Sequence, residues 1–314
     1  MFSLLRRLKL AYSVYNFFRK KELLHNLPLY RKLGLKKKYY SPVSSRDFRK
    51  FGFDEEKPVN TEALRSCAVF READEFSQQS MLNYDQNGYC IIRGLFEKDT
   101  LVINSEIDSL LERGLVKFGY GGKIMFAIHQ SKLLSRLATD TKLTALLDVF
   151  MKGRAVLFQS INFIKGSEQD THSDSIHMTS FPPGGLLGVW IALEDINMDN
   201  GPLHYYPGSH KLPYYMNADY GNEGNRFLLG RKSYKAYEKM IAEKIADQRI
   251  TKEIFTARRG DVLIWHANLF HGGEPHLDKH KSRKSMVLHY FREGSICYHE
   301  ITQRPALIKA ISKE

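Results

Sequence analysis

The sequence predicts a mainly β protein with flanking helices, built as an antiparallel sandwich or barrel. Its 314 residues are 43% hydrophobic and 12% aromatic, enough for a sizeable core in one large domain or two modest ones. The second half of the chain contains a series of short apolar segments, each bounded by Gly, Pro, Asn or Asp. Helical patterns do not alternate regularly with these segments, which argues against a parallel α/β sheet.

Residues 1–60 are predicted to form a basic arm that contains an amphipathic helix. The first 50 residues hold 14 Lys and Arg against two acids, whereas the rest of the chain has 33 of each sign. The net charge of +12 therefore comes from the arm, and the neutral main fold argues against a nucleic-acid-binding cleft. A helical wheel places these apolar residues on one side of the opening helix: Leu4, Leu8, Ala11, Tyr12, Tyr15 and Phe18.

This basic helix has three interpretations. The pattern is typical of a helix that lies on an anionic membrane surface, where each nearby base contributes about 1 kcal/mol of attraction. A helix packed on the domain with its charges in water explains the pattern equally well. A transit peptide is the third interpretation, and the equally basic stretch 32–40 that follows disfavours it.

Cysteine usage and hydropathy predict a cytoplasmic protein. Cys67, Cys90 and Cys297 share no metal-binding or redox spacing, which favours buried thiols in a reducing compartment. No apolar run approaches the roughly 18 residues needed to cross a bilayer, and the opening segment lacks the features of a secretory signal. We expect peripheral contact with an anionic membrane through residues 1–50.

The main domain is expected to span residues 84–295. A connector with short helical pieces, 61–83, precedes it, and the turn at 85–88 leads into a short apolar strand at 89–92. Helical patterns follow at about 98–114 and 131–151. The apolar segments then predict five strands, at 155–164, 186–195, 203–208, 261–267 and 285–291.

Two further segments complete the chain. A charged helical pattern at 233–249 interrupts the strands and lies in an insert of about 211–257. Residues 296–314 are expected to form a C-terminal tail. We find no internal repeat and no low-complexity segment.

The stretch THSDSIHM, residues 171–178, carries the candidate metal ligands. Side chains two apart on a strand point the same way, so His172 and Asp174 would face one spot. An imidazole and a carboxylate suit iron when one more histidine completes a face and leaves positions open. The best candidate for the third ligand is His271, with His266 as its rival. An H-x-D triplet alone occurs often by chance.

At this point four segments of the chain become recognisable. DQNGYCIIRGLF, THSD, VWIALEDINMDNGPLHYYPGSHK and RRGDVLIWHANLFHGGEPHLDKHKSRKSMVLHYF resemble the phytanoyl-CoA dioxygenase family of Fe(II)/2-oxoglutarate oxygenases, over about residues 84–295. The third segment is the most specific. Its residues 200–203 and 207–210 look like the signature turn between two core strands of the family, and they also suit a strand-turn-strand by their own chemistry.

The resemblance implies a double-stranded β-helix, a jelly roll whose sheets clasp the metal at one mouth. It implies Fe(II), 2-oxoglutarate and O2 as cofactors, with ascorbate as an optional reductant. The resemblance maps the iron ligands onto His172, Asp174 and His271. It also implies contacts to 2-oxoglutarate from Arg283, to the distal carboxylate, and from Lys123 and Trp190, in the pocket. Gln159, on the strand before the triad, is a further candidate contact to the same ligand. Gly273 departs from the family, where many members have serine.

The predicted function is therefore hydroxylation of an unactivated C–H bond in a small molecule. The basic arm alone suggests a lipid or envelope-precursor substrate. The alternative is a catalytically inactive jelly-roll binding protein held at a membrane by that arm. A third interpretation, in which the arm makes the chain a membrane or nucleic-acid adaptor, assigns no role to His172 and Asp174.

Overall fold

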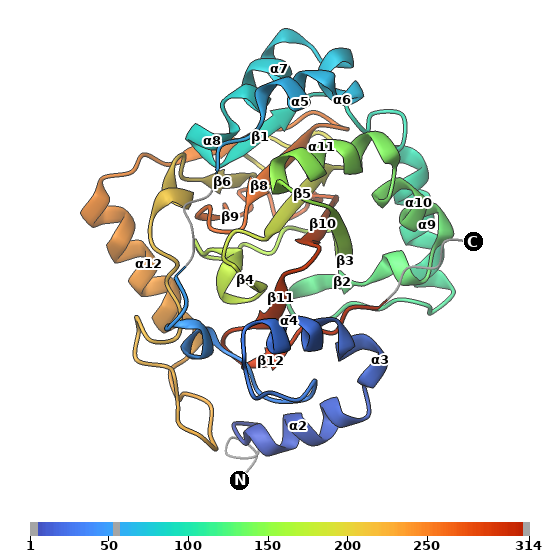
Figure 1. Ribbon diagram of the computed structural model, residues 1–314. Coiled ribbons are helices and arrows are strands. Elements are labelled where there is room, and N and C mark those ends of the chain that lie inside the picture. The colour runs from blue at the N-terminus through green and yellow to red at the C-terminus, as the bar shows by residue number, and fades with distance from the viewer. Residues whose placement is uncertain (1–5, 53–56, 310–314) are drawn as a thin grey trace.

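The computed structural model of the protein describes residues 6–52 and 57–309 (Figure 1). Leu4, which the helical wheel included, lies outside the described residues. The described helices are α2 (Lys9–Phe17), α3 (Lys20–Leu23), α4 (Leu27–Lys32), α5 (Thr61–Ser66), α6 (Ala68–Glu72), α7 (Glu75–Leu82), α8 (Tyr84–Asn87), α9 (Thr100–Glu112), α10 (Lys132–Ala138), α11 (Thr141–Met151) and α12 (Tyr234–Gln248). The described strands are β1 (Tyr89–Ile92), β2 (Lys123–Met125), β3 (Ala155–Phe163), β4 (Thr179–Phe181), β5 (Leu186–Ala192), β6 (Leu203–Tyr205), β7 (Glu253–Phe255), β8 (Val262–His266), β9 (His271–Gly273), β10 (Ser285–Arg292), β11 (Ile296–His299) and β12 (Arg304–Pro305).

A six-stranded antiparallel sheet with the order β1-β8-β5-β10-β3-β2 forms the centre of the fold. Side chains alternate across each of its strands. On β5, Leu187, Val189 and Ile191 pack into the core shared with the helices, whereas Trp190 and Ala192 pack into a second cluster on the other face. Figure 1 shows helices α5–α7 and α11 against the first of these faces. The sheet therefore has one helix-covered face and one face turned toward the site.

A three-stranded sheet, β7-β6-β9, packs against the second face and completes the jelly roll. Leu203 and Tyr205 of β6 and Phe255 of β7 belong to the same apolar cluster as Trp190 and Trp265 of the central sheet. Because antiparallel strands on two packed sheets enclose a cavity at one end, this arrangement leaves room for a site between β9 and the central sheet. The predicted fold class is confirmed.

All five strands predicted between residues 155 and 291 are present, as β3, β5, β6, β8 and β10. The helical pattern at 131–151 is divided into α10 and α11. Asp140 causes the division, because its side chain accepts hydrogen bonds from the backbone N–H groups of Lys142 and Leu143 and so caps a new helix. The charged pattern of the insert forms α12.

The N-terminal segment packs on the domain. Tyr30, Val43 and Phe48 are buried in one apolar cluster with Phe181 and Tyr298. The rings of Phe48 and Phe181 stack with centroids 4.3 Å apart. The connector helices α5 to α7 likewise contribute buried residues to the main core. Within residues 6–52 and 57–309, no helix combines the length and the apolarity needed to cross a bilayer.

The C-terminal segment differs from the predicted tail. Residues 296–305 form β11 and β12, which join β4 in a second three-stranded sheet. The apolar side chains of Ile296 and Tyr298 explain the difference, since both are buried against the N-terminal segment. The two ends of the chain therefore meet in one cluster.

Candidate iron site

Two histidines 99 positions apart in the sequence lie side by side at the mouth of the jelly roll. His172 and His271 form an antiparallel β-bridge, in which each backbone N–H donates to the carbonyl of the other at 2.9 Å. Residues opposite each other on paired strands place their side chains on the same face. The two imidazole rings accordingly stand with centroids 4.6 Å apart.

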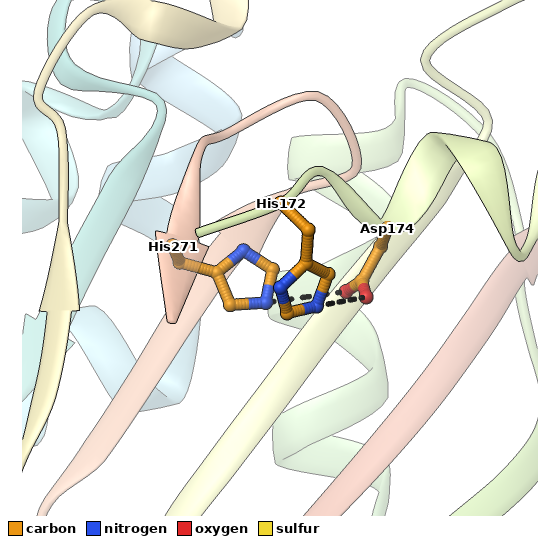
Figure 2. A group of neighbouring side chains, drawn as sticks. All are labelled: His172, Asp174 and His271. Atoms are coloured by element: carbon orange, nitrogen blue, oxygen red, sulfur yellow. Dashed lines mark ion pairs between the residues drawn. The ribbon is translucent and has the colours of Figure 1, made fainter. Parts of the chain in front are cut away.

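The carboxylate of Asp174 completes the group (Figure 2). Its two oxygens lie 3.9 Å from His172 Nε2 and 3.9 Å from His271 Nε2, and one ligand atom from each residue lies within 4.8 Å of the others. The sequence argument placed both residues on a strand; instead, Asp174 begins a short 3-10 helix, Asp174–Ile176. The two side chains still face one spot, because Ser173 between them is extended.

Hydrogen bonds prepare both histidines as metal ligands. His172 Nδ1 lies 2.9 Å from the carbonyl of Asp170, and His271 Nδ1 lies 2.9 Å from the carbonyl of Leu269. A carbonyl oxygen only accepts, so each Nδ1 carries a hydrogen and each Nε2 presents its lone pair toward the centre. Burial lowers the pKa of His172 well below its ordinary value and so keeps the ring neutral.

Asp174 is held as a carboxylate. Burial alone would raise the pKa of Asp174, but interactions with His271, His289 and His172 outweigh burial and hold this pKa far below its ordinary value. The Nε1–H of Trp265 donates to Asp174 Oδ2 at 2.8 Å, and His289 Nε2 lies 3.6 Å from the same oxygen. The site thus combines two imidazoles, each with its Nε2 toward the centre, and one oriented carboxylate.

The position of Trp265 depends on a glycine in the neighbouring strand. Gly188 of β5 is the register partner of Trp265, and a Cβ at Gly188 would collide with the indole ring. The missing side chain lets the indole lie across β5 toward Asp174. Sequence reasoning missed Trp265 and His289, since neither position carries a motif and only the strand register brings them to the carboxylate.

A cavity of about 310 Å³ contains the three candidate ligands and all four predicted 2-oxoglutarate contacts, Arg283, Lys123, Gln159 and Trp190. Arg283 is 1% exposed, and its Nη1 donates to the carbonyl of Gly201 at 3.1 Å. Its Nε has no hydrogen-bond partner, and in the described part of the chain no carboxylate pairs with the guanidinium. A buried cation without a counter-ion suits an anionic ligand.

The other predicted contacts, Lys123, Gln159 and Trp190, also line this cavity. Lys123 Nζ donates to Gln169 Oε1 at 3.2 Å, and burial lowers the pKa of Lys123. The indole Nε1 of Trp190 is buried without a hydrogen-bond partner. Gly273 lines the cavity, and a Cβ at this position would meet the backbone of Glu168 and Gln169 at 3.4–3.6 Å.

Three other histidines, His266, His177 and His280, lie in different surroundings. The rival candidate His266 belongs neither to the metal-binding group found among the described residues nor to the cavity wall. Its Nδ1 accepts from the backbone N–H of Asn268 at 3.1 Å, and its ring packs near His210. His177 lines the cavity, whereas His280 is exposed.

Comparison with known proteins decides the family. The family profile described as Phytanoyl-CoA dioxygenase (PhyH) matches residues 84–285. The chain belongs to the phytanoyl-CoA dioxygenase family. "Phytanoyl-CoA dioxygenase domain-containing protein 1" of Bos taurus is 30% identical over 225 residues, which cover 70% of this chain and 72% of the relative. The Rattus norvegicus protein of the same name is 25% identical over 224 residues, with the same coverage.

Solved structures share the fold of this family member. The non-heme α-ketoglutarate-dependent carbocyclase SnoK superimposes with a TM-score of 0.60 at 15% identity, covering 78% of this chain and 97% of the other. EctD from S. alaskensis, crystallised with 2-oxoglutarate and 5-hydroxyectoine, superimposes with a TM-score of 0.57 at 19% identity, covering 84% of this chain and 94% of the other. The predicted family and jelly-roll fold are confirmed, and so is the enzyme class, a 2-oxoglutarate-dependent non-haem iron dioxygenase.

Proposed function

We propose that the protein hydroxylates an unactivated C–H bond of a small molecule, with Fe(II) held by His172, Asp174 and His271. The convergence of these three side chains from two distant segments carries the proposal. Two neutral imidazoles and one carboxylate form the facial ligand set of non-haem Fe(II) oxygenases. Both Nδ1–H groups and the Trp265 indole fix the ligands before the metal arrives.

The co-substrate 2-oxoglutarate would bind in the same cavity, with its distal carboxylate on Arg283. The buried guanidinium has a free Nε–H and no carboxylate partner among the described residues, so it offers a two-point contact that a lysine could not copy. Lys123, Gln159 and Trp190 line the same cavity and would hold the rest of the ligand. Bound Fe(II) would supply the oxidising chemistry in which 2-oxoglutarate, O2 and R–H become succinate, CO2 and R–OH.

The protein's own part in this reaction is positioning and exclusion of water. Trp265 and His289 hold Asp174 at the metal, and the backbone bridge holds His172 against His271. The apolar walls of the cavity, which include Ile161, Phe163 and Leu203, limit the access of water. A site of this kind favours oxidation of the bound substrate over release of the oxidant.

Domain limits, location and substrate follow from the sequence argument. The dioxygenase domain is residues 84–295, with an insert of about 211–257, and the arm 1–60 and the C-terminal segment are additions to it. We place the protein in the cytoplasm, since its three cysteines are free and buried. The substrate is a lipid or envelope precursor, and the arm contacts an anionic membrane.

Succinate formation without any added substrate tests this function. Purified protein supplied with Fe(II), 2-oxoglutarate and ascorbate should release succinate above background, because uncoupled turnover without substrate is common in the family. His172→Ala should abolish this release, and His280→Ala, at an exposed position outside the cavity, should leave it intact. Background-level release by the unaltered protein would instead support the inactive binding protein.

A further inference from the structure

Helix α2 buries polar side chains and exposes apolar ones, which is the reverse of an amphipathic helix packed on a soluble domain. Its polar residues Lys9 and Asn16 are buried, at 9% and 2% exposure. Its apolar residues Leu10, Val14 and Phe17 point to solvent and are exposed by 72%, 53% and 52%. These three lie at i, i+4 and i+7, so they form one continuous stripe along the outer side of the helix.

Neighbouring residues extend this apolar surface. Phe18, directly after α2, is 78% exposed. The backbone N–H of Lys9 donates to the carbonyl of Phe227, which brings the loop of the insert beside the start of α2 and adds a phenyl ring that is 68% exposed. Figure 1 shows α2 at the outer edge of the molecule, at the bottom of the view. We call Leu10, Val14, Phe17, Phe18 and Phe227 the α2 face.

The charges around the α2 face are almost all positive. The only two acids of residues 1–50 are already paired, Glu22 with Arg19 at 3.5 Å and Asp47 with Lys37 at 3.0 Å. Lys20 and Lys21, which follow Phe18, are exposed, and within the described residues no carboxylate pairs with them. An apolar stripe with unpaired cations beside it matches a bilayer that carries anionic headgroups.

Tyrosines stand where the headgroup layer would be. Tyr39 and Tyr40 lie beside Phe17, with ring centroids 6.5 and 5.5 Å from its ring. Tyrosine is enriched at membrane interfaces, since its ring is apolar and its hydroxyl is wet. Phe17 is thus the apolar centre of an aromatic group whose outer members suit the interface.

A second cavity, of about 250 Å³, lies between the inner edge of α2 and the cavity that contains the candidate iron ligands. Tyr15 and Asn16 line it at one end, and the exposed side chains of Tyr15 and Phe126 show that it reaches the surface. Its other end shares Gln159, His177, Met178 and His299 with the cavity that contains the candidate iron ligands. The two cavities therefore adjoin at these four side chains, whose movement would join them.

The wall of the second cavity is mainly apolar. Phe158 and Phe291 stack with centroids 4.3 Å apart on one side of it, and Ala306 and Leu307 lie on another. One cation, Arg304, stands near Tyr12 of α2 at its outer end. An apolar passage with a cation at its entrance suits an amphiphile with an aliphatic chain and an anionic or zwitterionic head.

We propose that the α2 face docks into an anionic lipid membrane, and that the second cavity is the passage through which an amphiphile from that membrane reaches the iron site. The docking part stands on the surface alone, whereas the passage rests on the proposed function. In this arrangement the protein contacts the membrane through the α2 face, and the entrance of the second cavity lies beside the bilayer.

Vesicle sedimentation tests the docking surface. Full-length protein should pellet with vesicles of equimolar phosphatidylcholine and phosphatidylserine, and much less with phosphatidylcholine alone. The double variant Phe17→Ser, Phe18→Ser should reduce the bound fraction by at least about 10-fold. The matched control is Phe76→Ser with Leu101→Ser, two exposed apolar residues on α7 and α9, and it should pellet like the unaltered protein.

Two outcomes would overturn the docking surface. The first is equal pelleting of the Phe17, Phe18 variant and the unaltered protein. The second is an unaltered protein that does not pellet but self-associates through Phe17 and Phe18, which would make the α2 face a contact between copies. Sedimentation requires neither iron nor 2-oxoglutarate, so a protein that pellets but forms no succinate retains the docking surface and loses the proposed function.

A spectroscopic titration tests the passage. Dodecylphosphocholine below its critical micelle concentration should change the visible absorption of the anaerobic complex with Fe(II) and 2-oxoglutarate. Ala306→Trp, which narrows only the second cavity, should weaken this effect at least about 10-fold without removing the absorption itself. Leu307→Trp provides a second block if the first variant does not fold. No response in the unaltered protein, or an equal response in a folded blocked variant, overturns the passage.

Discussion

Trp265→Phe isolates one hydrogen bond to the candidate metal ligand Asp174. The indole Nε1–H lies 2.8 Å from Asp174 Oδ2, and the donor is neutral while the acceptor is charged and buried. Such a bond contributes about 1.5–3 kcal/mol. A phenyl ring keeps most of the apolar packing against Gly188, so the lost bond should dominate the effect. We therefore expect Fe(II) affinity to fall about 10- to 100-fold, or about 1.4–2.7 kcal/mol.

Anaerobic calorimetric titration with Fe(II) measures this effect, and the chain provides a matched control. Trp190→Phe makes the same chemical change in the same cavity, but the Nε1 of Trp190 has no hydrogen-bond partner. We expect its Fe(II) affinity to stay within about 3-fold of the unaltered protein, because no bond to a ligand is lost. The reasoning fails if Trp265→Phe binds Fe(II) as tightly as the unaltered protein, or if both variants weaken equally.

Two further predictions concern the co-substrate and the N-terminal segment. Arg283→Lys should raise the dissociation constant for 2-oxoglutarate about 10- to 100-fold and leave the Fe(II) affinity unchanged, because the ammonium group of lysine cannot make the bidentate contact of a guanidinium. An unchanged dissociation constant for 2-oxoglutarate would show that Arg283 does not bind it. Burial lowers the pKa of His25 to about 4, below an unfolded value near 6.5. As pH falls, His25 therefore binds a proton in the unfolded chain before it does so in the folded protein, and the free energy of unfolding decreases. His25→Gln should reduce this decrease between pH 7 and pH 5 by about 2 kcal/mol, measured in urea titrations at the two pH values. An equal loss in both proteins would contradict burial of the N-terminal segment.

The N-terminal segment also limits how membrane binding is tested. Removal of residues 1–50 would uncover Phe181, Ile296 and Tyr298, which pack against Tyr30 and Phe48. The truncated protein would expose new apolar surface and could bind vesicles for that reason alone. Substitutions on the outer side of α2 avoid this difficulty, because they leave the buried cluster intact.

The central strands and the metal ligands could be predicted from the sequence because their signals are local. Apolar runs bounded by turn residues mark β5, β8 and β10, and the two-residue spacing of His172 and Asp174 brings them to one side. The third ligand was harder, since His266 and His271 share one segment. The backbone bridge between His172 and His271 distinguishes them, and such pairing between distant segments has no local signal.

The features that could not be predicted all depend on long-range packing. Trp265 reaches Asp174 only through the register of β5 and β8. The predicted tail became two strands, since β11 pairs with β4 more than a hundred residues earlier. The helical wheel gave α2 a different apolar side, since the structure buries Lys9 and Asn16 and exposes a stripe that begins at Leu10, which the wheel did not include.

The visible absorption of the anaerobic protein with Fe(II) and 2-oxoglutarate tests the ligand assignment most directly. We predict a weak charge-transfer band in the unaltered protein, its loss in Asp174→Ala and in His271→Ala, and its retention in His266→Ala. A band that survives in His271→Ala, or disappears in His266→Ala, would contradict the iron site described above.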